Sequence, residues 1–141
     1  MSRLLVAVTL GIVAGVAGAT TAKATQSPDD ATGNRMERAR RGEQIYTRCL
    51  ACHALNYDRV GPRHCGLIGR RAGSVPGFDY SAAMKKSGIT WNEATLNRFL
   101  ARPLKMVPGS TMTYDGVPNA RERADLIVYL RQAGESTECR K

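Results

Sequence analysis

The chain has 141 residues, of which 43% are apolar, 23% charged and 6% aromatic, and its formal net charge is +9. This length fits one small domain, the apolar fraction argues against intrinsic disorder, and 4 cysteines are too few for a disulfide-dense scaffold. The excess of 21 Lys and Arg over 12 Asp and Glu predicts an anionic partner, and composition leaves nucleic acid, a membrane surface and an acidic protein open.

Residues 1–24 have the pattern of a secretory signal peptide. A short basic start precedes an uncharged apolar run over residues 4–19, and small residues stand at the −3 and −1 positions of a cleavage site after Ala24. The run is shorter than the ~20 residues of a membrane span, although an uncleaved N-terminal tether is the alternative. We therefore expect export to the periplasm and a mature chain, 25–141, whose charge falls from +9 to +7 with the loss of two basic residues.

The mature chain alternates helical patterns with loops rich in Gly and Pro. Residues 25–34 are polar, and we expect them to be flexible. Helices are predicted over residues 35–49, 81–87, 91–102 and 120–133.

Two of these helices carry start signals, and two long loops lie between the predicted helices. Thr90 followed by Glu93 predicts a capping box for the third helix, and Asn119 is the expected cap of the fourth. We find no strand pattern and no internal repeat. The loops over residues 54–80 and 103–118 are long for the core available, which indicates that they wrap around something.

The strongest chemical signal is Cys49-Leu50-Ala51-Cys52-His53, because C-x-x-C-H is the attachment signature of a c-type haem. Residues at i, i+3 and i+4 share one face of a helical turn, so two thiols can bond one porphyrin while the imidazole reaches its iron. A disulfide or a thioredoxin-like pair is the alternative, but the βαβ context is missing. A zinc site would need further Cys or His pairs that the chain lacks.

An electron-carrying haem iron needs a ligand on the face opposite His53. The candidates are His64 and four methionines, Met36, Met84, Met106 and Met112. Met often fills cores, so Met84 and Met106 have an ordinary structural alternative. Met112 lies in a proline-stiffened loop, and spacing alone favours it without excluding the others.

Several further motifs follow the haem signature in a characteristic order. Besides CLACH they are GP (61–62), PGFDYS (76–81), GITW (88–91), TL (95–96), PGSTM (108–112) and ERADLIVYL (122–130). In this order and near-spacing the chain resembles the class I cytochromes c, as a bacterial counterpart of mitochondrial cytochrome c, over residues 42–133.

The resemblance implies an all-α class I cytochrome c fold over residues 35–141, with three main helices, short helices and long loops around one covalently bound haem c. It implies that Cys49 and Cys52 carry this haem, and that His53 and Met112 are the axial ligands of its iron. The carbonyl of Pro62 would accept the N–H of the proximal imidazole, and Gly42 and Tyr46 would cross the last helix near Leu126 and Tyr129. The residues at the positions that hold the propionates are Arg70, Tyr80 and Trp91.

Three residues depart from the family pattern. Phe99 stands where a Tyr is usual and Met84 where an Asn is common, so both changes should make the pocket drier. His64 replaces a usually apolar residue, and we expect it to be an ordinary loop histidine, with a buried imidazole as the alternative.

Cys65 and Cys139 remain after the haem takes the other two cysteines. An even remainder in an exported protein points to one disulfide. Since the family fold brings the loop near Cys65 close to the end of the last helix, the resemblance implies a Cys65–Cys139 bond. Two free thiols are the alternative.

The resemblance predicts a periplasmic single-haem electron carrier that is not an enzyme. Its partners would be a cytochrome bc complex and an oxidase, a photosynthetic reaction centre or a dehydrogenase. The alternatives are a haem enzyme that acts on peroxide or a small gas through a displaceable sixth ligand, and a thiol–disulfide module without haem.

We expect a monomer that docks transiently on acidic faces of redox proteins, binds no nucleic acid, and is not inserted in a membrane after signal cleavage. The basic residues spread along the chain that could form its docking face are Arg48, Arg63, Arg98, Arg102, Lys105, Arg121 and Arg123.

Overall fold

The computed structural model describes residues 28–140, so the predicted signal peptide lies outside the described residues. This part of the chain is all-α, as predicted, and its β pairing is limited to one isolated bridge between Arg71 and Thr90. Its helices are α1 (Pro28–Tyr46), η1 (Thr47–Cys49), α2 (Ala82–Lys86), α3 (Glu93–Ala101), α4 (Pro103–Met106), α5 (Ala120–Gly134) and η2 (Thr137–Cys139), where η denotes a 3₁₀ helix.

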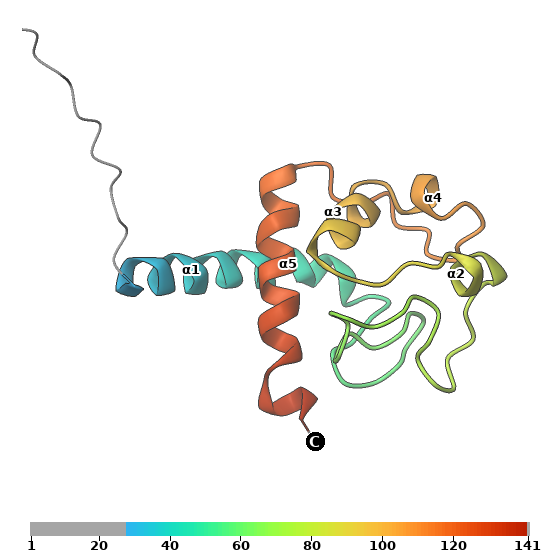
Figure 1. Cartoon of the computed structure of the whole chain (residues 1–141), viewed down its shortest axis with the longest axis horizontal. Helices are drawn as coiled ribbons and strands as arrows, with labels where there is room; N and C mark the ends of the chain where they lie inside the picture. Colours follow the sequence, from blue (N-terminus) through green and yellow to red (C-terminus); the bar gives the residue numbers. More distant parts are fainter. Residues whose placement is uncertain (1–27, 141) are drawn as a thin grey trace, which may run out of the picture.

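The first helix, α1, begins at Pro28 rather than near Arg35. Proline is well suited to the first helical position, because its fixed φ fits a helix and the N–H it lacks has no partner there anyway. Residues 32–37 are all exposed, and this stretch of α1 projects beyond α5 in Figure 1. Residues 28–34, which we expected to be flexible, are therefore part of this helix. The helix ends at Tyr46 and continues into η1.

Helices α1 and α5 cross at Gly42, as the resemblance predicted (Figure 1). A Cβ at Gly42 would overlap the backbone carbonyl of Asp125 and lie 2.7 Å from the Cβ of Tyr129. The ring of Tyr46 packs against that of Tyr129, with 5.1 Å between centroids. Leu126 is completely buried beside this contact.

Ion pairs close the same crossing on its polar side. The Asp125 carboxylate accepts from Nε of Arg38 at 2.9 Å and from Nε of Arg41 at 2.8 Å. Burial acts to raise the pKa of Asp125, but the hydrogen bonds and charges of Arg41 and Arg38 outweigh it and hold this pKa below its ordinary value. The two helices are therefore held together by backbone contact, apolar packing and charge at one place.

Helix α3 begins at Glu93, two residues past the predicted start at Trp91, and its cap is not the predicted Thr90–Glu93 pair. Instead Asn92 Oδ1 accepts from the N–H of Thr95 at 2.9 Å, while Thr95 Oγ1 accepts from the N–H of Asn92 at 2.8 Å. Trp91 stays outside the helix because its N–H donates to the carbonyl of Arg70 and its carbonyl accepts from Gly69.

The other helices follow their sequence signals closely. Helix α2 occupies the predicted segment, and Asn119 Oδ1 caps α5 by accepting from the N–H groups of Arg121 and Glu122 at 2.9 and 3.2 Å. Pro103 ends the preceding helix as expected and also starts the four-residue α4 inside the predicted loop.

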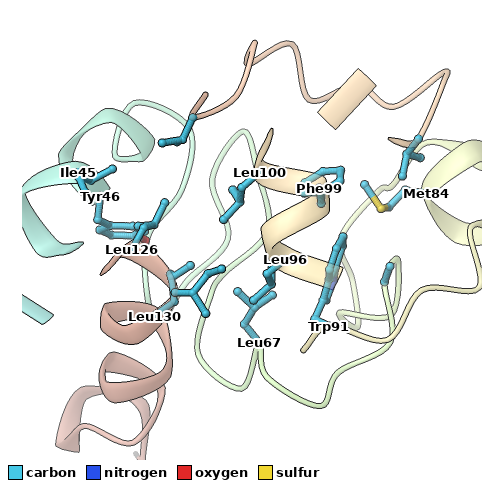
Figure 2. Packing of buried hydrophobic residues seen from close by; sticks show 14 residues of the cluster. Ile45, Tyr46, Leu67, Met84, Trp91, Leu96, Phe99, Leu100, Leu126 and Leu130 are labelled. Atoms are coloured by element: carbon cyan, nitrogen blue, oxygen red, sulfur yellow. The ribbon is translucent and has the colours of Figure 1, made fainter. Parts of the chain in front are cut away.

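The core joins the α1–α5 crossing to α3 and to the loop between η1 and α2 (Figure 2). Among residues 28–140 no helix is long and apolar enough to cross a membrane. The labelled core residues of Figure 2 are Ile45, Tyr46, Leu67, Met84, Trp91, Leu96, Phe99, Leu100, Leu126 and Leu130.

Candidate haem-binding site

The long loops and the helices enclose a cavity of about 420 Å³. Cofactor pockets commonly measure roughly 300–1,000 Å³ and are mostly apolar with a few placed polar groups. Here the apolar walls come from α2, α3, α5 and the loops, and the polar lining groups include His53 and Arg70. The apolar lining residues include Leu67, Met84, Trp91, Leu96, Phe99, Leu100, Leu126 and Leu130.

The Cys49–His53 turn opens onto this cavity. The N–H groups of Cys52 and His53 both donate to the carbonyl of Cys49, at 3.1 and 2.9 Å, so the segment forms a helical turn. Both thiols are free and line the cavity. Burial raises the pKa of Cys49 to about 11, whereas redox-active thiols have lowered pKa values. Burial therefore does not activate the Cys49 thiol as a redox group.

His53 is buried and oriented by the backbone of the loop that follows it. Its Nδ1–H donates to the carbonyl oxygen of Pro62 at 2.8 Å, the contact that the resemblance implied. A ring that donates from Nδ1 keeps a free lone pair on Nε2, which suits a metal ligand. Burial lowers the pKa of His53, with partial opposition from the Pro62 hydrogen bond, so the imidazole is neutral near pH 7.

Gly61 makes room for this ring. A Cβ at that position would lie 2.6 Å from Nε2 and 2.7 Å from Nδ1 of His53, closer than real Cβ contacts come. The N–H of Gly61 donates to the carbonyl of Cys52 at 2.7 Å, which closes the loop back on the Cys49–His53 turn. A side chain at this position would displace the imidazole.

The candidate distal ligands divide into two groups. Met84, Met112 and His64 line the cavity together with His53, whereas Met36 is 62% exposed on α1. Met106 does not line the cavity either. The loop that carries Met112 is shaped by Ser110, whose Oγ accepts from the N–H of Met112 at 3.2 Å.

The three residues predicted to hold propionates all line the cavity. Two N–H groups of the Arg70 guanidinium donate to the carbonyls of Arg63 and Cys65, each at 2.8 Å, so three of its five remain available. No described residue accepts a hydrogen bond from the indole N–H of Trp91. Burial raises the pKa of Tyr80, against the opposing charge of Arg70, so its hydroxyl stays protonated as a donor.

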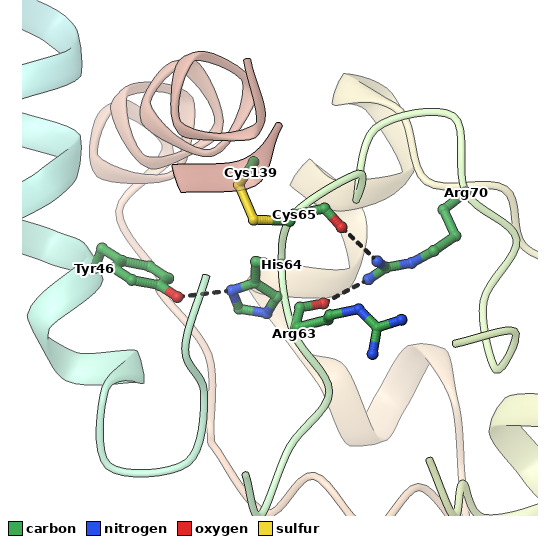
Figure 3. The surroundings of a disulfide bond; sticks show 6 residues. All are labelled: Tyr46, Arg63, His64, Cys65, Arg70 and Cys139. Atoms are coloured by element: carbon green, nitrogen blue, oxygen red, sulfur yellow. Dashed lines mark hydrogen bonds between the residues drawn. A yellow bond between two sulfur atoms is a disulfide. The ribbon is translucent and has the colours of Figure 1, made fainter. Parts of the chain in front are cut away.

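His64 is not the outward-turned loop histidine that we expected. Its ring stacks on that of His53, with centroids 4.3 Å apart and 21° between planes, and its Nδ1 is 3.1 Å from the hydroxyl of Tyr46 (Figure 3). Burial holds the pKa of His64 well below its ordinary value. No local pattern predicts this contact, because Tyr46 lies 18 residues earlier on another element.

Cys65 and Cys139 form a disulfide, as the resemblance implied (Figure 3). Their Cα atoms are 5.2 Å apart although 74 positions separate them in sequence. The bond joins the loop next to His64 to η2, beyond the end of α5. It thus fixes the cavity wall to the C-terminal part of the chain.

The donor set and the cavity fit a c-type haem. Two free thiols, a neutral imidazole with an available Nε2 and a thioether all face one apolar cavity, while Arg70, Tyr80 and Trp91 offer donors for carboxylates. Phe99 and Met84 are both buried and line the cavity, and their effect on its dryness stays a prediction.

Some of the candidate docking residues are already paired. Arg48 bonds Glu122 and Arg63 bonds Asp58, each at 2.9 Å. Arg123 donates to Asn97 and to the carbonyls of Val117 and Pro118. Arg98, Arg102, Lys105 and Arg121 have no carboxylate partner within residues 28–140.

Known proteins are similar to this chain, although no protein-family model matches it. Cytochrome c2 of Rhodomicrobium vannielii is 45% identical over 93 residues, which cover 64% of this chain and 74% of the relative. Cytochrome c type-1 of Ascaris suum is 43% identical, with 71% and 88% covered. The solved structure of cytochrome cH from Methylobacterium extorquens superimposes with a TM-score of 0.65 at 40% identity, covering 67% of this chain and 97% of that one.

The fold and the site therefore define a haem-binding electron-transfer protein. The chain belongs to the class I cytochrome c family, whose members carry covalent haem c, act as electron carriers rather than enzymes, and meet their redox partners transiently.

Proposed function

We propose that this protein is a periplasmic carrier of single electrons that holds one haem c through Cys49 and Cys52, with His53 and Met112 as axial ligands. The observation that carries the proposal is the hydrogen bond from His53 Nδ1–H to Pro62, which leaves Nε2 free inside a cavity that Met112 also lines. When bound, the haem supplies an iron that alternates between ferric and ferrous states.

The chain's own residues serve electron transfer by keeping fixed positions around the haem site. Pro62 keeps the His53 ring in one tautomer, and Ser110 shapes the turn before Met112. The buried apolar walls exclude water, so little has to reorganise around the site when the charge changes by one unit.

Arg70, Tyr80 and Trp91 are proposed to bind the two haem carboxylates. Arg70 is a charged donor with three free N–H groups, and the other two add neutral donors. Because the guanidinium of Arg70 is braced by the carbonyls of Arg63 and Cys65, its position is set before a ligand arrives.

Export and partner choice complete the proposal. The signal pattern of residues 1–24 supports a periplasmic location, where haem attachment and the Cys65–Cys139 bond are both favoured. Four basic residues without a carboxylate partner among the described residues support docking on acidic faces of a cytochrome bc complex, an oxidase, a reaction centre or a dehydrogenase. They are Arg98, Arg102, Lys105 and Arg121.

Haem staining of the denatured band, together with the intact mass, tests covalent attachment. We expect the wild-type protein and the Cys65→Ser/Cys139→Ser variant to keep one haem per chain, whereas Cys49→Ala/Cys52→Ala loses it. A wild-type band without haem, or staining that survives the second variant, would contradict the proposal.

Ligand addition to the native protein separates a carrier from a haem enzyme with an open sixth position. A site sealed by Met112 should bind carbon monoxide or cyanide slowly at neutral pH. Immediate binding by the wild-type protein would argue for the enzyme.

A further inference from the structure

His64 lies against the proximal imidazole in a place that haem attachment and iron ligation do not use. The rings of His64 and His53 are nearly parallel, at 21°, with 4.3 Å between centroids. Stacked aromatic rings at this separation resist rotation relative to each other, because turning one ring gives up contact with the other. The orientation of the His64 ring therefore restricts the rotation of the His53 ring.

The main chain at Gly61 also lies against the His53 ring. The Cβ that a side chain would add there would lie over the ring, 2.6 Å from Nε2 and 2.7 Å from Nδ1. His64, Gly61 and the Pro62 hydrogen bond therefore all restrict the imidazole.

The backbone that carries His64 is fixed on both sides. Its N–H is shared between the carbonyls of Ala54 and Leu55, at 3.1 and 3.0 Å. The neighbouring carbonyls, of Arg63 and Cys65, accept from Arg70, and Cys65 is tied to Cys139 (Figure 3). The loop at His64 is thus anchored more firmly than a surface loop usually is.

The side chain of His64 is fixed by Tyr46. The Tyr46 hydroxyl and Nδ1 of His64 are 3.1 Å apart, and either tautomer of the imidazole can make this hydrogen bond. Tyr46 is itself buried in the α1–α5 crossing and packs on Tyr129. The close-packed α1–α5 crossing is in this way connected to the proximal ring.

We propose that His64, oriented by Tyr46, is a positioning residue that sets the rotation of the His53 ring about its Cβ–Cγ bond. This inference rests on the proposed function, in which His53 ligates the haem iron. The angle of an axial imidazole plane determines how unpaired electron density is distributed over a ferric haem, so the Tyr46–His64 pair should influence electronic properties that packing alone would leave unchanged.

The test is the pattern of haem methyl resonances in the ferric holoprotein with cyanide bound. Cyanide takes the distal position and is cylindrically symmetric, so the spread of these resonances reports the plane of His53 alone. The variants are His64→Leu, which removes the ring, and Tyr46→Phe, which removes only the hydrogen bond. Tyr129→Phe is the matched control, because it removes the hydroxyl from the ring that packs beside Tyr46. No described residue forms a hydrogen bond with that hydroxyl.

We expect His64→Leu to change the spread and order of the methyl resonances and to shift the midpoint potential. Tyr46→Phe should move both in the same direction by less, the double variant should add nothing to His64→Leu, and Tyr129→Phe should leave both unchanged. A merely structural role would lower the unfolding midpoint while the methyl pattern stayed that of the wild type.

An unchanged methyl pattern in His64→Leu would overturn the inference while leaving the proposed function intact. If His64→Leu fails to fold, an unchanged pattern in Tyr46→Phe would do the same. A Tyr129→Phe shift as large as that of Tyr46→Phe would also overturn it. A wild-type protein without covalent haem would overturn the proposed function, and the inference with it.

Discussion

The two halves of the molecule are stabilised in different ways. At the α1–α5 crossing the chain meets itself, since Gly42 touches the Asp125 backbone and Leu126 is fully buried. On the cavity side Trp91, Phe99 of α3 and other apolar side chains face a space of about 420 Å³ that no described side chain fills.

The sequence thus encodes a complete interface at the α1–α5 crossing and an incomplete core on the cavity side. Apolar surface around a hollow gains neither dispersion contacts nor full release of water, so the loops that enclose it need a further apolar group. A porphyrin supplies that group in a cytochrome c. Folding of the loops should then depend on haem, while the crossing should depend on it less.

Removing haem attachment should have the largest effect. Cys49→Ala/Cys52→Ala is expected to lose protection from amide hydrogen exchange throughout the loop over residues 54–80, with more protection kept in α1 and α5. Hydrogen exchange followed by mass spectrometry measures both regions in one experiment. Equal loss in both halves would contradict the proposed division.

Breaking the disulfide comes next. Cys65→Ser/Cys139→Ser should lower the free energy of unfolding by about 4 kcal/mol in the chain-entropy model, and by less in the holoprotein because covalent haem already restrains the unfolded chain. Denaturant titration with and without reductant measures this loss. If reductant left the denaturation midpoint of the wild type unchanged, in a protein shown to be reduced, this result would count against the disulfide.

Two glycines of α1 test the close approach of α1 and α5. Gly42→Ala places a Cβ into the Asp125 backbone and should lower the free energy of unfolding by about 1–3 kcal/mol, or more. Gly33→Ala meets nothing within 4 Å and should raise it by up to about 1 kcal/mol, because alanine favours helix. Thermal unfolding of both variants decides the matter, and similar values for the two would refute the close approach.

The smallest expected effect concerns pH and Asp125. Its pKa is lowered below the ordinary value of 3.8 on folding, so its ion pairs stabilise the protein above that value and are lost as the pH falls towards the folded pKa. Asp125→Asn should therefore be less stable near pH 7 and should lose less stability on acidification than the wild type. Asp115→Asn, an exposed carboxylate with no ion pair within residues 28–140, should behave like the wild type.

Local sequence signals predicted the parts of the fold that depend on neighbours in the chain. The cap at Asn119 and the stop at Pro103 are examples, because each uses groups within one helical turn. The Cys49–His53 turn is another, since its spacing alone places both thiols and the imidazole on one face.

Features that depend on distant partners were missed. Asn92 caps α3 because the backbone of Trp91 pairs with Gly69 and Arg70, a loop that no local pattern connects to it. His64 was expected to face outward because its partners, Tyr46 and His53, come from other elements. The contact at Gly42 and the Cys65–Cys139 bond were anticipated only through the family resemblance.

The ferric optical spectra of Met112→Ala and Met84→Leu test whether Met112 ligates the haem iron, since both methionines line the cavity. A haem ligated by His53 and Met112 gives a sulfur-to-iron charge-transfer band in the wild type. We predict that Met84→Leu keeps this band and Met112→Ala loses it and binds carbon monoxide readily when reduced. A band that survives in Met112→Ala, or that is absent from the wild type, would contradict the account.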